Sequence, residues 1–367
     1  MKQILFLIVF LGIGLGNGEV AFAKKSGGRL VLAVGDKLEK GDPYRFDEIK
    51  RSYERSARLA LDHFRSDNPS VLVDPEIVFF LEDSPIDKIF EKIVSSNALA
   101  VVGFKRTPSA KAATTLADKH KITMISPVSP IDEVVSGFYS RGLAFPLSKT
   151  KPVIQDFGKD FKSKFIILKQ DAPLANAHEV PKDFVAIDDL DKEEARKKIP
   201  DGSLLFFPGY AYEHLGAIKK LLSEGKTVTL LGSTPWAYSE DLLRRYSLNC
   251  EIYSVSQFFD RTISTSQINS DSAARAGANR FVGDYKKIFG EVPESSAHSF
   301  YDGMSLALSK IYLEHAKTRE QFYQKMQTFD FKGITGKIAF KNGKSERAGY
   351  LVKWTRDHFE PIKVYSQ

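Results

Sequence analysis

Three residues with ligand-binding chemistry, Lys105, Arg106 and Thr107, follow one another between an apolar run and a helical pattern. The apolar run at residues 99–102 predicts a strand that is buried on both faces. Thr107 stands where a helix N-cap is expected, and Pro108 suits the first helical position. Free N–H groups and the helix dipole favour negative charge at such a junction. The segment therefore predicts a site for a ligand that carries an anionic group such as a carboxylate or a phosphate.

The elements that must position this loop alternate between strand and helix patterns along almost the whole chain. Strand patterns occur at 29–34, 76–81, 165–169, 203–207, 227–231 and 251–255, and helical patterns at 47–64, 85–95, 148–160, 212–223 and 239–246. This alternation predicts an α/β fold with two doubly wound units in tandem. After residue 270 the chain turns helical, and Asn342-Gly343 then predicts a β-hairpin near the end.

The first residues have the pattern of a cleaved export signal. Met1-Lys2 is followed by a short apolar segment and by Ala21-Phe22-Ala23, which predicts a signal peptide at 1–23. The segment is too short and too rich in glycine for a membrane anchor. We therefore expect an exported, periplasmic protein without a membrane anchor.

Composition excludes several classes of function. The net charge of +7 is spread over scattered lysines and arginines with no basic stripe, so nucleic acid is not an expected partner. The single Cys250 forms no internal disulfide, and the seven histidines are dispersed, so no metal site is expected. No nucleophile elbow, zinc-protease motif or phosphate loop is present. We expect no catalytic residues, no cofactor and no enzyme activity.

The ordered set of motifs resembles the type I periplasmic solute-binding proteins, the branched-chain amino acid receptor group of ABC transporters. It includes AVVGFKRTPSAKAATTLADKHKITMISPVS, GFYSRGLAFP, FFPGYAYEHLGAIKKL and SFYDGMSLAL, and it covers nearly all of the mature sequence. The resemblance implies two Rossmann-like lobes joined by three hinge crossings, which close over a ligand as a Venus flytrap. Lobe one is expected at 24–145 plus 258–340, and lobe two at 146–257 plus 341–367. Asp302 is expected to be structural and to bond the neighbouring lobe-one backbone.

The resemblance also implies which residues line the cleft. In amino-acid receptors of this group the ligand carboxylate meets a hydroxyl and backbone N–H groups, and the matching position in the first loop is Thr107. In the second loop Val128 offers an N–H, while Pro130 replaces the usual hydroxyl residue and leaves Ser129 as its only substitute. Tyr210 matches an aromatic residue of lobe two.

The acidic partner of the ligand ammonium falls at Thr234, so a standard amino acid is disfavoured as the ligand. Two alternatives stay open at the neighbouring positions. Lys105 and Arg106 either enter the cleft or point to solvent at its rim, and Trp236 either forms a stacking wall or packs inside lobe two. The expected ligand-binding residues are Lys105, Arg106, Thr107, Val128, Ser129, Tyr210, Thr234 and Trp236.

Two functions of different class follow. The first is an extracytoplasmic receptor that closes over a small, polar, anionic ligand and delivers it to an ABC permease. The alternative is a regulatory module of the same fold with a degenerate cleft, which acts through protein partners in envelope or cell-wall assembly. In either case we expect a monomer or a weak dimer.

Overall fold

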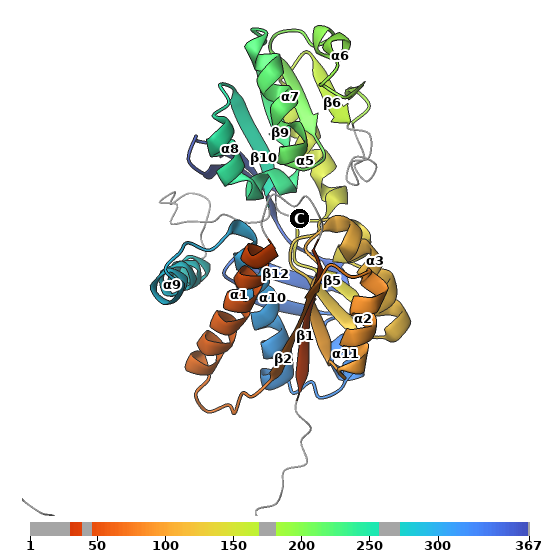
Figure 1. The fold of residues 1–367 in the computed structure, drawn as a ribbon, viewed down its shortest axis with the longest axis vertical. Helices are drawn as coiled ribbons and strands as arrows, with labels where there is room; N and C mark the ends of the chain where they lie inside the picture. The colour runs from red at the N-terminus through yellow and green to blue at the C-terminus, as the bar shows by residue number, and fades with distance from the viewer. Residues whose placement is uncertain (1–29, 39–45, 169–180, 257–271, 366–367) are drawn as a thin grey trace, which may run out of the picture.

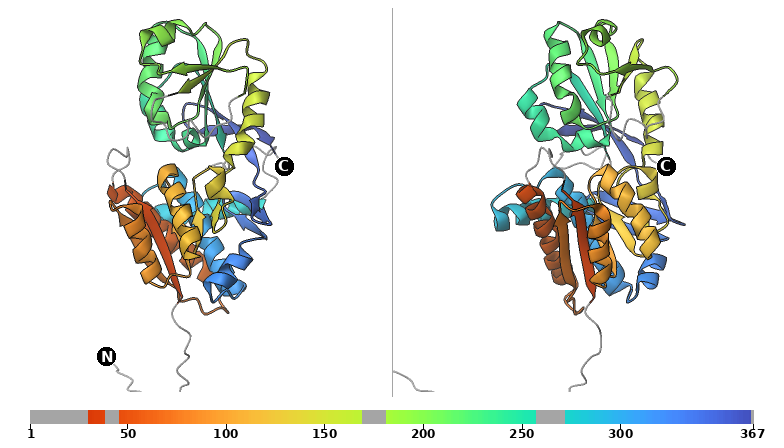
Figure 2. Two further views of the ribbon diagram at one scale, coloured as in Figure 1. Left: turned by 90° about the vertical axis from the view of Figure 1, so that its right-hand side faces the viewer. Right: turned by 45° about the vertical axis from the view of Figure 1, so that its right-hand side comes forward.

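The computed structural model describes residues 30–38, 46–168, 181–256 and 272–365 of the 367-residue chain. The expected signal peptide at 1–23 lies outside the described residues. Figure 1 shows two α/β lobes one above the other, and Figure 2 shows that the C-terminal strands, in blue, contribute to both. None of the described helices is long and apolar enough to cross a membrane.

Lobe one is built on a parallel sheet with the strand order β2-β1-β3-β4-β5. Its strands are β1 (Val31–Lys37), β2 (Glu76–Glu82), β3 (Ala100–Gly103), β4 (Thr123–Ser126) and β5 (Ser140–Gly142). Its helices are α1 (Phe46–Asp67), α2 (Ile86–Ser95), α3 (Thr107–His120), α4 (Asp132–Val135), α9 (Ser272–Phe289), α10 (Ser295–Leu308) and α11 (Arg319–Lys325), and α10 continues into a π-helical turn at Ser309–Leu313.

Helices cover both faces of this sheet because successive side chains of a strand point to opposite sides. Leu32 and Val34 pack in one cluster with α1 and α10, whereas Val31 and Ala33 pack in another with α2 and α3. The strands are therefore buried on both faces, as the continuous apolar runs of the sequence predict.

Lobe two has a seven-stranded sheet with the order β15-β14-β10-β9-β8-β6-β7. The five strands from β10 to β7 run parallel, and β14 and β15 add an antiparallel edge. The strands are β6 (Lys164–Leu168), β7 (Val185–Asp188), β8 (Ser203–Phe207), β9 (Val228–Gly232), β10 (Glu251–Ser256), β14 (Gly349–Trp354) and β15 (Phe359–Tyr365). The helices are α5 (Thr150–Gly158), α6 (Glu193–Lys197), α7 (Ala211–Ser223) and α8 (Glu240–Tyr246), with 3-10 turns η1 (Leu147–Lys149) and η3 (Thr234–Tyr238). The expected pair of doubly wound lobes is confirmed.

A small third sheet of β11 (Phe329–Gly333), β12 (Gly336–Lys341) and β13 (Lys344–Ser345) packs against lobe one. Asn342 and Gly343 both have positive φ and form the expected turn between β12 and β13. Because β13 pairs with β12, the last passage to lobe two lies after Ser345, a few residues beyond the boundary expected at residue 340. The chain first enters lobe two after β5, and its return between β10 and α9 falls at 257–271, outside the described residues.

Asp302 holds this small sheet against α10. Its buried carboxylate accepts hydrogen bonds from the N–H groups of Ile334 and Thr335, at 2.8 Å each, and from the Thr335 hydroxyl. Burial raises the pKa of Asp302, while these donors oppose the rise. The expectation that Asp302 bonds the lobe-one backbone is confirmed.

Candidate functional site

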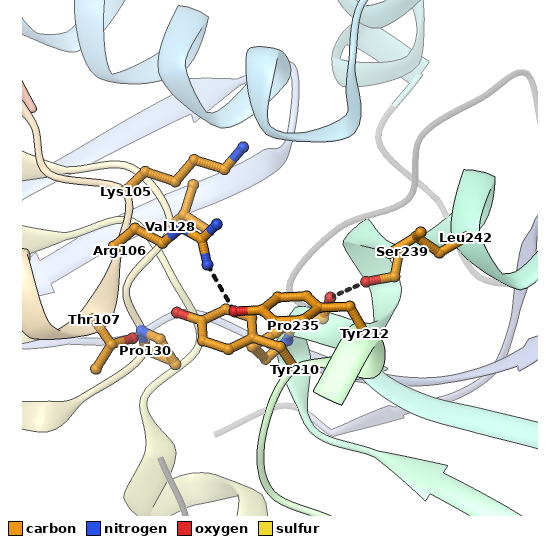
Figure 3. A pocket seen from close by; sticks show the side chains of 10 residues that line it. All are labelled: Lys105, Arg106, Thr107, Val128, Pro130, Tyr210, Tyr212, Pro235, Ser239 and Leu242. Carbon is orange, nitrogen blue, oxygen red and sulfur yellow. Dashed lines mark hydrogen bonds between the residues drawn. The ribbon is translucent and has the colours of Figure 1, made fainter. Parts of the chain in front are cut away.

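A cavity of about 60 Å³ lies between the two lobes and is lined by residues from both. Loops at the carboxyl ends of β3 and β4 form the lobe-one wall, and segments that follow β8 and β9 form the lobe-two wall. Ligands of open α/β sheets bind at these strand ends. The lining residues, drawn in Figure 3, are Lys105, Arg106, Thr107, Val128, Pro130, Tyr210, Tyr212, Pro235, Ser239 and Leu242.

The lobe-one wall depends on a tight turn at the end of β3. Gly103 lies directly beside Gly35 of β1, and the next residue, Phe104, has a φ of 62°, in the left-handed region. The N–H of Phe104 still donates to the Gly35 carbonyl at 2.9 Å. The turn releases the chain from the sheet so that the next three residues line the cavity. Arg106 occupies the N-cap position and α3 begins at Thr107, one residue earlier than expected, with Pro108 inside the first turn, where its missing N–H costs nothing.

Asp36, a buried carboxylate near the end of β1, holds the loop between β3 and α3 in place. One of its oxygens accepts from the Lys105 N–H at 3.0 Å and from the Tyr53 hydroxyl at 2.8 Å, and the other accepts from the Lys37 N–H. Asp36 is 2% exposed, and burial raises its pKa from 3.8 to about 6, although the three hydrogen bonds oppose the rise.

The raised pKa of Asp36 predicts a pH-dependent stability. Between pH 4 and 6 the folded protein holds a proton on Asp36 that the unfolded chain releases, so the free energy of unfolding falls as pH rises through this window. The loss relative to an Asp36→Asn variant should reach about 3 kcal/mol by pH 7. Denaturant unfolding of both proteins between pH 4 and 7, followed by far-UV circular dichroism, measures the difference. Parallel stability profiles would show that Asp36 titrates normally.

Lys105 and Arg106 point in different directions. The Lys105 ammonium lies 3.1 Å from the carboxylate of Glu294, at the start of α10, and that carboxylate also accepts hydrogen bonds from Ser52 and Ser296. The Arg106 side chain instead crosses the cavity toward lobe two, and the residue is 9% exposed. The open alternative of a solvent-exposed pair at the rim is therefore wrong for Arg106, and Lys105 lies in an ion pair at the edge of the cavity.

Arg106 meets two tyrosines of lobe two. Its Nη1 donates to the Tyr212 hydroxyl at 3.0 Å, and its guanidinium carbon lies 5.3 Å from the Tyr210 ring centre and 5.8 Å from that of Tyr212. These distances are typical of cation–π contacts. Thr107, next along the loop, also lines the cavity, and its polar groups oppose the burial that raises the pKa of Tyr210. We call the Arg106–Tyr212 hydrogen bond the tyrosine bridge.

The start of α7 holds the two tyrosines in place. Tyr210 is the N-cap residue, and its N–H donates to the Glu213 carboxylate at 2.7 Å. The tyrosine rings are stacked, with centres 5.4 Å apart and planes 16° from parallel. On the same wall, the Ser239 hydroxyl donates to the Pro235 carbonyl at 3.0 Å and so ties η3 to the start of α8. The lobe-two wall is thus largely an aromatic surface.

Three of the residues expected to bind a ligand do not line this cavity. Trp236 is fully buried in the lobe-two core, where Gly232 leaves room for its ring and Phe207 lies 5.1 Å away, so the alternative of a packing residue applies. Thr234, in the same turn, is 1% exposed. Ser129 is 1% exposed and is not among the lining residues, although its neighbours Val128 and Pro130 are. Among the described residues, neither the Ser129 nor the Thr234 hydroxyl has a hydrogen-bond partner.

The lining also includes residues that were not expected to bind. Tyr212 carries the strongest new contact, and its position two residues after Tyr210 was the available signal. Pro235, Ser239 and Leu242 follow Thr234 in the chain. The sequence correctly predicted that this segment forms the lobe-two wall, but it predicted Thr234 and Trp236 as the lining side chains. Pro130 contributes its ring, although it offers neither a hydroxyl nor an N–H.

The lining predicts binding rather than catalysis. Of its described members Lys105 and Arg106 are cationic, none is a carboxylate, and the rest are aromatic, aliphatic or hydroxyl residues. No group of three or more His, Cys, Asp or Glu side chains in the described ranges is placed to hold a metal ion. Cys250 lies one residue before β10 and is half-buried, and burial raises its pKa to about 12, which makes it a poor nucleophile.

Comparison with known proteins gives a match in structure only. No family model and no curated protein matches the sequence. The branched-chain amino acid transporter substrate-binding protein LivJ from Streptococcus pneumoniae, solved with isoleucine, is 18% identical, with a TM-score of 0.71 over 92% of this chain and 100% of that one. The leucine-binding protein LivK from Thermotoga maritima is 17% identical, with a TM-score of 0.71 over 92% and 99%. A solute-binding protein of an ABC transporter from R. palustris, solved with benzoate, is 14% identical, with a TM-score of 0.68 over 92% and 97%. These likenesses extend over nearly the whole of each chain and show a shared fold.

Proposed function

We propose that this chain, which has the type I periplasmic binding protein fold, binds a small organic anion between its lobes and closes over it. The observation that carries the proposal is Arg106, a residue that is 9% exposed and lines a cavity between the lobes. A buried guanidinium is costly unless acceptors surround it, and it pairs with a carboxylate better than with any neutral group. A ligand carboxylate would replace the Tyr212 hydroxyl as the acceptor of Arg106.

The charges of the lining disfavour an amino acid as the ligand. The ammonium of an amino acid needs a carboxylate partner, and none of the described lining residues provides one. Thr234, where the resemblance places that partner, lies outside the lining. Burying an unpaired ammonium costs several kcal/mol. We infer that the ligand is an organic acid without an amino group.

The apolar part of the lining indicates the body of the ligand. The Tyr210 and Tyr212 rings, together with Val128, Pro130 and Leu242, form most of the wall. Such a surface stabilises a flat or branched hydrocarbon group next to the carboxylate. The neighbour solved with benzoate illustrates a ligand of this chemistry on the same fold.

The cellular role proposed here is that of an extracytoplasmic receptor. Export through the signal peptide would place the chain in the periplasm, and an ABC permease would accept the ligand from the closed form. Neighbours in structure are substrate-binding proteins of ABC transporters, which is what favours this partner. We propose a monomer or a weak dimer.

One observation favours the second candidate, a regulatory module that acts through protein partners. The cavity of about 60 Å³ is far smaller than the cavity of about 150 Å³ that holds benzene in other proteins. The lobes already contact each other through their own side chains. If the cleft binds no small molecule, the regulatory module remains as the candidate function.

A thermal-shift experiment with matched ligands separates the candidates. Benzoate and benzamide differ in charge, and 4-methylpentanoate and leucine differ by the amino group. We expect benzoate and 4-methylpentanoate to raise the melting temperature and benzamide and leucine to leave it unchanged. A ligand at 100 times its dissociation constant adds about 2.7 kcal/mol of stability. Stabilisation by leucine alone would refute the anion proposal, and no shift with any organic acid would favour the regulatory module.

A further inference from the structure

The cavity is small because the protein fills its own binding site. The Arg106 guanidinium of lobe one is a hydrogen-bond donor that faces the cleft, and its acceptor is the Tyr212 hydroxyl of lobe two. Thr107 and Tyr210 lie on the two walls of the same cavity. The remaining space of about 60 Å³ admits water but no organic acid with a hydrocarbon body.

We propose that the Tyr212 hydroxyl is an internal competitor for the ligand: it occupies the anion-binding donor of Arg106 and joins the two lobes until an anion displaces it. This inference rests on the proposed function for the nature of the displacing ligand. The contact between the lobes through Arg106 and Tyr212 stands on the geometry alone.

The two tyrosine side chains differ in how easily they can move out of the cavity. The Tyr210 backbone is held by the hydrogen bond from its N–H to Glu213, and the residue is half-buried. Tyr212 is 38% exposed and is the second residue of α7, so its side chain can rotate to solvent without unfolding the helix. Displacement therefore begins at Tyr212, and an opening of the hinge then separates Tyr210 from Thr107.

Competition has a definite thermodynamic consequence. The bridge stabilises the closed, ligand-free form, and it is absent once the anion is bound. A variant without the Tyr212 hydroxyl therefore loses stability only in the ligand-free closed form, so more of the free protein is open and the anion binds more tightly. A hydroxyl that contacted the ligand directly would have the opposite effect on affinity.

The test compares Tyr212→Phe with the parent protein in two measurements. The first is the distance between labels on lobe one and lobe two, placed by Lys88→Cys and Lys219→Cys in a Cys250→Ser background, in the absence of any ligand. The second is calorimetric titration with benzoate. We expect a larger population of open molecules and about five- to twentyfold tighter binding of benzoate, since one hydrogen bond to a charged group is removed from the competing state.

Tyr246→Phe is the matched control, because it removes a tyrosine hydroxyl from α8 of lobe two at a position outside the cavity lining. It should change neither measurement. An unchanged distance distribution in Tyr212→Phe, or a weaker affinity for benzoate, would overturn the inference. A more open Tyr212→Phe protein with no benzoate binding in either form would refute the anion proposal and leave the bridge between the lobes intact.

Discussion

Replacing Arg106 with methionine is expected to weaken the binding of benzoate by about a hundredfold or more, because removing one partner of a buried charge pair costs about 3–5 kcal/mol. Methionine keeps much of the length and apolar contact of the arginine stem, so the change tests the guanidinium rather than the packing. The variant also loses the hydrogen bond to Tyr212, which frees part of the cleft. That gain is small beside the loss of the only described cation that crosses the cavity. Calorimetric titration of both proteins with benzoate measures the difference.

Lys111→Met provides the control for this prediction. Lys111 lies on α3, one turn after Arg106, and its side chain is 67% exposed. The substitution removes the same charge from the same region without touching the cavity, so the affinity should change little. Equal affinities in the Arg106→Met and parent proteins would show that Arg106 is not the anion partner.

Replacing Gly103 with alanine is expected to destabilise lobe one by about 3–5 kcal/mol, since it combines an unfavourable backbone angle with a steric clash. Gly103 has a φ of 154°, and a Cβ atom there would lie 2.0 Å from the backbone oxygen of Gly35. Neither atom can move without separating β1 from β3. The turn that directs Arg106 and Thr107 into the cleft begins at this residue, so the affinity for benzoate should fall as well.

Two probes localise the effect of Gly103→Ala. Both tryptophans, Trp236 and Trp354, lie in lobe two, so their fluorescence reports that lobe, while far-UV circular dichroism reports both. The dichroism midpoint should move to much lower denaturant, and the fluorescence midpoint should move less. Gly283→Ala is the control, because a Cβ on this exposed residue of α9 meets no atom within 4 Å, and alanine favours the helix. Similar midpoints in both variants would mean that the strand contact at Gly103 is not tight.

Much of the fold was predictable because it depends on local patterns. The apolar runs that end at Val34, Val102 and Phe207 are long enough for buried strands, and each is followed by a helical pattern with one apolar face. Alternation of this kind has few solutions other than a doubly wound sheet. The hairpin at Asn342-Gly343 followed from the positive φ that both positions adopt.

Only the part of the candidate site that lies on the loop between β3 and α3 was predictable from the sequence. Lys105, Arg106 and Thr107 line the cavity because a loop between β3 and α3 must lie at the strand ends. The direction of each side chain was not predictable. The Lys105 side chain points to the carboxylate of Glu294, which lies almost two hundred residues later in the chain. The Arg106 side chain points to two aromatic rings of the other lobe. Trp236 was misjudged because its room in the core comes from Gly232, a contact that local sequence does not reveal.

The tyrosine bridge depends on how the two lobes meet, which no periodicity in the chain determines. Tyr212 follows Tyr210 by two residues on α7, and both reach the cavity only because the helix begins there and the N-cap turns their rings toward lobe one. The chemistry of the site, an arginine beside two tyrosines in a lining without a described carboxylate, is the observation behind our proposal that the ligand is not an amino acid.

The most direct test of the account is a crystal structure of the protein with the organic acid that gives the largest thermal shift. We expect the ligand carboxylate within hydrogen-bond distance of the Arg106 guanidinium and the Thr107 N–H, with the Tyr212 hydroxyl displaced from Arg106. A ligand bound elsewhere, or an intact hydrogen bond between Arg106 and Tyr212 in a crystal saturated with the acid, would contradict the account.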